Sequence, residues 1–225
     1  MPYICRALAL GALHPDLPDQ VEIVTKRHLD KLNGADRPGV IARTSDHITF
    51  RPGQPALALL DFDAKGMPPH VTAKLDQLGG FWSAIGSVCP NLATVERVSR
   101  RSTSAGLYLA NTLEELPGSN GIHVYVAVDN GTDIDRFLKV LYSRCWLAGL
   151  GWLMVGAGGQ LLERSIVDRV VGAAERLVFE GPPILEPPLA QDAERRRPIA
   201  TDGIVLAHGR TVYELRLDAR AIEAH

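Results

Sequence analysis

The pattern of apolar and polar positions predicts strands separated by helices along most of the chain. Residues 58–62 form a short apolar run bounded by turn-forming residues, which is typical of a buried strand. Residues 122–128 give the strongest strand pattern, and 93–99 and 176–180 are shorter examples. The elements follow one another without a regular strand–helix–strand rhythm. The pattern therefore favours a mixed α/β (α+β) fold over a doubly wound sheet.

Helical spacing marks two longer segments. Between residues 69 and 88 apolar side chains recur every three or four positions, and Gly79-Gly80 interrupts the pattern. A second helix is expected from 134 to 147, after a turn that supplies a cap. Nearer the N-terminus the expected elements are a helix within 17–32 and a hairpin with arms 39–43 and 47–50.

The composition is that of an ordinary soluble globular protein. Of the 225 residues 46% are hydrophobic and 22% charged, so the chain can bury a sizeable core. No apolar stretch is long enough to span a bilayer, and the first residues lack the pattern of a secretory signal. We therefore expect a cytoplasmic protein with no membrane partner. The cysteines are far apart and form no C-x-x-C pair, which argues against a zinc knuckle, and Cys89 and Cys145 are expected to be buried free thiols.

The charge balance gives no general signature of a nucleic-acid binder, because the net charge is −2. Basic residues nevertheless cluster at 97–101 and at 195–197. Such runs are usually solvated faces, and a nucleic-acid role stays open for both. Residues 182–198 are rich in proline and are expected to be extended and poorly packed. The glycine-rich stretch 149–159 lacks the Gly-Lys-Ser/Thr ending of a phosphate loop.

The apolar run that begins at Ala58 ends in two carboxylates one residue apart, Asp61 and Asp63. On a strand both would point to the same side, with Phe62 packed behind them. Like charges held together are costly unless a cation lies between them, and hard divalent cations prefer oxygen ligands. Taken alone, the pair is explained more simply as a solvated strand end, and a metal site is the alternative.

Two further features carry possible chemistry. In residues 118–123 a small, flexible turn leads to His123 on the strand expected at 122–128. Asp168 follows Ile166 and Val167, so a second apolar run ends in a carboxylate. Taken singly, a strand histidine is more often a hydrogen-bonded structural residue, and a lone aspartate is more often a helix cap or a surface turn.

Taken in order, the three features resemble the catalytic domain of the archaeo-eukaryotic primase superfamily, in particular its primase-polymerase branch found with mobile elements and repair ligases. That family carries an acidic-hydrophobic-acidic motif, then a Ser/Gly-rich turn leading to a strand histidine, then a hydrophobic-Asp motif. The matching positions here are Asp61 and Asp63, residues 119–123, and Val167 with Asp168. The resemblance covers roughly residues 50–190.

The resemblance implies an α+β core in which an RRM-like subdomain packs on an N-terminal αβ subdomain. It also implies template-directed nucleotidyl transfer, as a DNA primase or DNA polymerase, in the replication of a mobile element, plasmid or phage. Asp61, Asp63 and Asp168 would hold two Mg²⁺ or Mn²⁺ ions that clamp the oxygens of an in-line displacement. The implied partners are a single-stranded DNA template, ribo- or deoxynucleoside triphosphates and, further, a helicase.

The remaining candidate residues follow from the same resemblance and from charge. His123 would contact the incoming triphosphate, beside Ser119 and the backbone amides of Asn120 and Gly121. Further candidates for phosphate binding are Arg176, Arg164 and Lys65. Candidates for the template backbone, on charge alone, are Arg100 and Arg101.

The chain departs from the family pattern in two respects. The small hydroxyl residue that usually stands two positions before the histidine is Gly121 here, and the zinc-binding cysteines of some members are absent. Residues 1–225 are expected to be one catalytic domain, either standing alone or followed by a helicase or accessory domain. The alternatives are a replication-initiation module that binds nucleic acid without catalysis, another metal-dependent phosphotransferase or nuclease, and a metabolic α/β domain with accidental matches.

Overall fold

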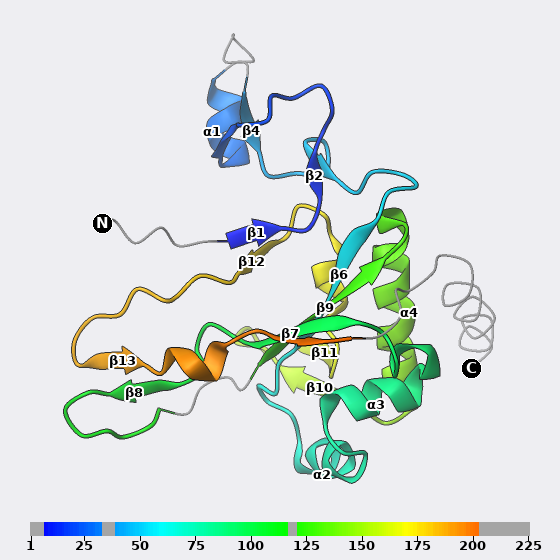
Figure 1. Ribbon diagram of the computed structural model, residues 1–225, viewed down its shortest axis with the longest axis vertical. Coiled ribbons are helices and arrows are strands. Elements are labelled where there is room, and N and C mark those ends of the chain that lie inside the picture. The colour runs from blue at the N-terminus through cyan, green and yellow to red at the C-terminus, as the bar shows by residue number, and fades with distance from the viewer. Residues whose placement is uncertain (1–6, 33–38, 117–120, 203–225) are drawn as a thin grey trace.

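The largest sheet of the protein has helices on one face and a layer of short strands and loops on the other (Figure 1). The computed structural model describes residues 7–32, 39–116 and 121–202. Its α-helices are α1 (Lys26–Lys31), α2 (Pro69–Gln77), α3 (Phe81–Val88) and α4 (Ile134–Leu147). Its 3-10 helices are η1 (Pro90–Leu92), η2 (Gly131–Asp133), η3 (Arg169–Gly172) and η4 (Ala193–Arg196). None of the helices in these ranges has the length and apolarity required to cross a bilayer.

The strands form one sheet of four and several pairs, so the fold is mixed α/β as the sequence predicts. The strands are β1 (Ala7–Ala9), β2 (Ala12–Leu13), β3 (Glu22–Val24), β4 (Val40–Ala42), β5 (Ile48–Thr49), β6 (Ala56–Phe62), β7 (Arg97–Arg101), β8 (Leu107–Leu109), β9 (Ile122–Val128), β10 (Gly151–Val155), β11 (Leu161–Ser165), β12 (Leu177–Phe179), β13 (Leu189–Gln191) and β14 (Ile199–Thr201). The four-stranded sheet has the order β14-β7-β9-β6, and its neighbours are all antiparallel.

The strands predicted at 58–62 and 122–128 are confirmed as β6 and β9, which pair over their whole length. β9 also pairs with β7, so the strongest strand pattern of the sequence lies inside the sheet. β7 begins at Arg97, later than the expected 93–99, because η1 begins at Pro90 and occupies the start of that segment.

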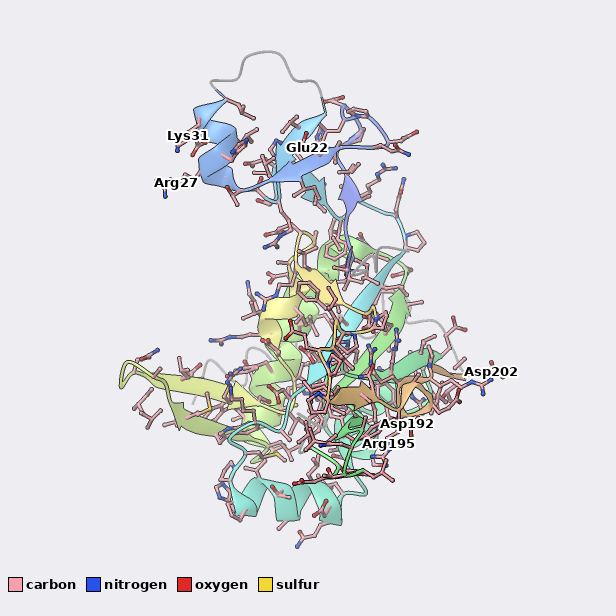
Figure 2. The ribbon with its side chains drawn as sticks, turned by 90° about the vertical axis from the view of Figure 1, so that its left-hand side faces the viewer. Glu22, Arg27, Lys31, Asp192, Arg195 and Asp202 are labelled. Atoms are coloured by element: carbon pink, nitrogen blue, oxygen red, sulfur yellow. The ribbon has the colours of Figure 1, made fainter. Side chains whose placement is uncertain are left out.

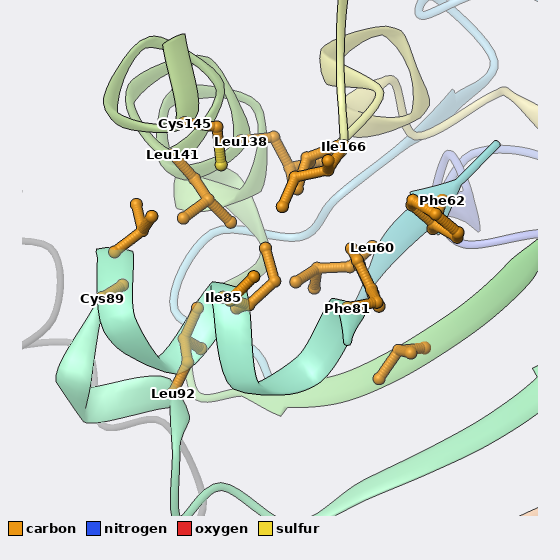
Figure 3. Packing of buried hydrophobic residues seen from close by; sticks show 14 of the residues in the cluster. Leu60, Phe62, Phe81, Ile85, Cys89, Leu92, Leu138, Leu141, Cys145 and Ile166 are labelled. Atoms are coloured by element: carbon orange, nitrogen blue, oxygen red, sulfur yellow. The ribbon is translucent and has the colours of Figure 1, made fainter. Parts of the chain in front are cut away.

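Alternate side chains of β6 pack against α3 and α4 (Figure 3). Leu60 is fully buried there, and Phe62 stacks on Phe81 with 4.9 Å between ring centroids. The predicted break between two helices is confirmed, because Gly79 and Gly80 both have positive φ, which glycine adopts without strain. The helix expected at 134–147 is confirmed as α4.

The two described cysteines are buried free thiols, as the sequence predicts. Cys89 follows α3 and Cys145 lies on α4, and both belong to the hydrophobic core (Figure 3). Burial raises the pKa of Cys145 to about 12. The thiol therefore stays protonated and acts as a small apolar side chain.

A conservative change in this core should have a small but measurable effect on stability. Ile85 on α3 is fully buried between the sheet and α4. Replacing it by valine removes one methylene and should lower the free energy of unfolding by about 0.5–1.5 kcal/mol, measured by urea denaturation. Ile184→Val is the matched control, because Ile184 is 72% exposed. Equal effects of the two changes would contradict this description of the core.

The N-terminal part folds differently from the sequence-based expectation. Only Lys26–Lys31 of the segment 17–32 is helical, because Glu22–Val24 forms β3 and the Thr25 side chain caps α1 by accepting from the His28 amide. The expected hairpin is wrong: β4 pairs in parallel with β3, and β5 pairs with β2. Figure 2 shows Glu22, Arg27 and Lys31 together in this lobe, far from Asp192, Arg195 and Asp202.

Two other segments are more ordered than their composition indicates. The glycine-rich stretch supplies β10 and the turn of the hairpin β10–β11, which projects beside the sheet (Figure 2). The proline-rich segment 182–198 contains β13, which pairs with β8, and η4, whose Arg196 is only 3% exposed. This segment is therefore not poorly packed throughout, because a buried guanidinium fixes it to the rest of the fold.

Candidate active site

A row of polar side chains crosses the sheet on the face opposite to the core helices. In the register of β6, β9 and β7, Asp61 lies opposite His123, and His123 lies opposite Arg100. Directly opposed residues of antiparallel strands project on the same face. The alternation that sends Leu60 and Phe62 into the core therefore places this acid–imidazole–guanidinium row on the other side.

The three carboxylates predicted to bind metal line one cavity of about 370 Å³. Asp61 is at the end of β6 and Asp63 follows that strand. Asp168 reaches the same place because its chain segment passes the end of β6, where its backbone N–H donates to the Asp61 carbonyl over 3.1 Å. The buried side chains of Ile166 and Val167 anchor this segment in the core.

Local hydrogen bonds orient two of these carboxylates. Asp63 Oδ1 accepts from the Lys65 backbone N–H over 2.9 Å, and Asp168 Oδ1 accepts from that of Val170 over 2.8 Å. Asp168 is therefore the cap of η3, the simpler explanation that the sequence left open, and it also lines the cavity. Each carboxylate uses one oxygen in these bonds and has further lone pairs for a ligand.

The charges around Asp61 act on it in opposite directions. The pKa of Asp61 is raised, chiefly by burial of its carboxyl group. The charge of His123 lowers this pKa, and the negative charges of Asp168 and Asp63 raise it further. The charge of Arg176 lowers it more weakly. A positive charge in the cavity would therefore favour the ionised form of Asp61.

The chemistry of the donor set fits a hard divalent cation. In the described ranges, no group of three or more His, Cys, Asp or Glu side chains stands in an arrangement that could itself hold a metal ion. Three carboxylates nevertheless line one cavity, and two of them raise the pKa of the third. A Mg²⁺ or Mn²⁺ ion would be held by Asp61, Asp63 and Asp168 and would neutralise that repulsion.

A second cavity, of about 350 Å³, also borders Asp61. His123 and Arg176 line it together with the hydroxyl segment 102–104. Its apolar wall consists of Leu59, Val171, Leu177, Val178 and Phe179. Asp61 and Arg176 line both cavities, so the two spaces meet at these side chains.

His123 is held between two carboxylates. Its Nδ1 lies 2.5 Å from Glu180 Oε1 and its Nε2 lies 3.6 Å from Asp61 Oδ1. Burial works to lower the pKa of His123, but the hydrogen bond to Glu180 and the charges of Asp61 and Glu180 outweigh burial and raise it. The imidazole is thus favoured in its cationic form, at the edge of the second cavity.

Glu180, which the sequence analysis did not select, organises this part of the site. Its carboxylate also accepts from the Tyr125 hydroxyl over 2.5 Å and pairs with Arg100 at 3.3 Å. Burial works to raise the pKa of Glu180, but the hydrogen bonds from His123 and Tyr125 outweigh it and lower the pKa. The sequence does carry a signal for Glu180: like Asp61 and Asp168, it is a carboxylate at the end of an apolar run.

A buried arginine connects Glu180 to the neighbouring backbone. Arg196 donates to the carbonyls of Ser102, Gly181 and Glu180 over 3.1, 3.3 and 3.3 Å. Arg100, expected on charge alone to contact a template, donates to the Arg196 carbonyl over 2.9 Å as well as to Glu180. Arg100 is thus part of the site's internal network.

The other predicted site residues are placed as follows. Lys65 and Arg164 line the first cavity, and Arg101 is exposed at the end of β7. Gly121 is buried beside the second cavity, and its carbonyl accepts from the Ser102 backbone N–H over 2.9 Å. Ser119 and Asn120 lie outside the described residues.

Comparison with models of protein families, with curated proteins and with solved structures found no match to this chain. The chemistry of the site is therefore inferred from its own geometry and from the order of its motifs.

Proposed function

We infer that the protein is the catalytic domain of a primase-polymerase, which joins nucleotides on a single-stranded DNA template. The observation that carries this proposal is the position of Asp61 between two different sets of groups. On one side it shares a cavity with Asp63 and Asp168, and on the other it shares a cavity with His123 and Arg176. An acidic metal-binding side beside a cationic phosphate-binding side is what nucleotidyl transfer requires.

In this proposal the acidic residues bind metal and the basic residues bind phosphate. Asp61, Asp63 and Asp168 would hold Mg²⁺ or Mn²⁺, which when bound neutralises charge on the attacking and leaving oxygens. The His123 imidazolium and the Arg176 guanidinium bind the phosphate oxygens of the incoming nucleotide. Glu180 fixes the orientation of the imidazole through Nδ1, so that Nε2 faces Asp61 and the cavity.

The order of the motifs and the sheet support the same proposal. The acidic pair, the strand histidine and the third aspartate occur in the order of the archaeo-eukaryotic primase motifs and line adjoining cavities. The four-stranded antiparallel sheet with helices on one face supports an RRM-like core, with the segment before β6 as the N-terminal αβ part. Exposed Arg101 is the stronger of the two template-backbone candidates, because Arg100 is engaged with Glu180.

A primer-extension experiment tests the proposal. The purified protein is incubated with a labelled primer on a single-stranded DNA template, Mg²⁺ or Mn²⁺, and either ribo- or deoxynucleoside triphosphates. We expect the primer to lengthen only when metal, template and a complementary nucleotide are all present. Shortening of the strand would instead show a nuclease, and binding of DNA without extension would show a non-catalytic replication module. Either result would overturn the proposal, as would the absence of any interaction with nucleotide or DNA.

A further inference from the structure

Gly121, two residues before His123, faces the side chain of Ser102. A Cβ atom at position 121 would lie 3.2 Å from Ser102 Cβ and 3.3 Å from Ser102 Oγ. These distances are shorter than nearly all ordinary Cβ contacts. The space that a side chain at position 121 would use is therefore occupied by the hydroxymethyl group of Ser102, which belongs to another part of the sequence.

The backbone of Ser102 is fixed on both sides. Its N–H donates to the Gly121 carbonyl over 2.9 Å, and its carbonyl accepts from Arg196 Nε over 3.1 Å. The Ser104 hydroxyl lies 3.4 Å from the Ser102 hydroxyl, whereas the Thr103 hydroxyl donates to the Phe179 carbonyl over 2.8 Å. Ser102 thus has a defined position at the cavity, a condition for a specific contact with a ligand.

Ser102 lines the same cavity as the two groups that the proposed function assigns to phosphate. The lining includes Ser102, His123 and Arg176. A hydroxyl donor beside an imidazole N–H and a guanidinium is suited to the oxygens of a phosphate group.

We propose that Ser102 donates its hydroxyl to a phosphate of the bound nucleoside triphosphate, and that it takes the place of a hydroxyl side chain at position 121. This inference rests on the proposed function. It assigns phosphate binding to Ser102, the residue that follows β7, in addition to the residues selected from the sequence. It also gives a reason for glycine at 121, since a Cβ atom there would press against the Ser102 side chain.

Steady-state kinetics of primer extension with the full chain tests the assignment. Ser102→Ala should raise the KM for the nucleotide about 10- to 150-fold with little change in kcat, as expected when one hydrogen bond to a charged ligand is lost. Ser102→Thr, which keeps the hydroxyl, should retain most of the affinity. Ser87→Ala on α3 is the matched control and should match the wild type. A KM for Ser102→Ala within twofold of the wild-type value would overturn the inference.

Moving the hydroxyl provides a second, independent test. Gly121→Ser alone should raise KM, because the new side chain meets Ser102; Ser102→Gly alone should raise it because the hydroxyl is lost. The double variant should recover affinity, since removal of the Ser102 side chain takes away two of the three nearest contacts of the new Cβ, and the Phe62 carbonyl at 3.1 Å stays in both Gly121→Ser variants. Purely additive losses would contradict the shared position. Failure of the wild type to extend any primer would refute the proposed function itself, whereas a normal wild type with an unchanged Ser102→Ala variant refutes only this assignment.

Discussion

Replacing Asp61 by asparagine should lower the rate of nucleotide incorporation at least about 100-fold. Mutating a residue that only hydrogen-bonds to a metal ligand lowers metal affinity or activity about 10- to 100-fold, and Asp61 is proposed as a ligand itself. It is also the carboxylate common to both cavities, so its loss removes negative charge next to the metal and next to His123. Primer extension under single-turnover conditions measures the effect.

The same substitution should not reduce stability, and this separates a catalytic effect from misfolding. Burial raises the pKa of Asp61, so its ionised form opposes folding above the usual carboxylate pKa. The neutral amide has no such cost, and the free energy of unfolding of Asp61→Asn at pH 7 should equal or exceed that of the wild type. Asp76→Asn, at an exposed position of α2, is the control for activity. An active Asp61→Asn variant would remove the main support for metal-dependent catalysis.

Replacing Glu180 by glutamine should lower the free energy of unfolding by about 1.5–3 kcal/mol at pH 6, because hydrogen bonds to charged groups contribute amounts of this order. The carboxylate is 11% exposed and binds His123, Tyr125 and Arg100 together. Glutamine keeps the size of the side chain but loses the charge. Urea denaturation measures the difference. Glu194→Gln, at a carboxylate that is 82% exposed, should change stability by less than about 0.5 kcal/mol.

The difference between the wild type and Glu180→Gln should depend on pH in a defined direction. The pKa of Glu180 is lowered in the fold, so its contribution is complete above its usual value of 4.5 and is lost as pH falls through the folded value. The pKa of His123 is raised, so its contribution is complete below 6.5 and is lost as pH rises through the folded value. The stabilising effect of the pair should therefore be largest between pH 4.5 and 6.5. A difference that is constant from pH 3 to pH 9 would contradict the proposed ion pair.

Elements whose burial is periodic along the sequence were predictable, and pairings between distant segments were not. β6, β9 and α4 are confirmed because an apolar run or a helical spacing reports which face is buried. The partner of β4 depends on which strand reaches it in space, and its parallel pairing with β3 leaves no local signal. The expected hairpin was wrong for this reason.

In the candidate site, too, local patterns were predictable from the sequence and contacts between distant segments were not. The sequence selected Asp61, Asp63 and Asp168, and these do line one cavity. It did not select Glu180, although the local pattern was similar, because no motif pointed to it. For the basic run at 195–197 it indicated a solvated face or a nucleic-acid contact, whereas Arg196 is buried against three backbone carbonyls. The contacts that bury a charge are made by residues far away in the sequence.

The wall shared by the two cavities has a thermodynamic consequence. Asp61 and Arg176 line both spaces, so they interact with a cation in the first and with an anion in the second. A cation that attracts Asp61 weakens the electrostatic attraction of that carboxylate for His123 and Arg176, and leaves these two groups available to phosphate. By linkage, each ligand must change the affinity for the other by the same factor. Metal and nucleotide should thus bind with positive cooperativity, even though no element of the fold has to move.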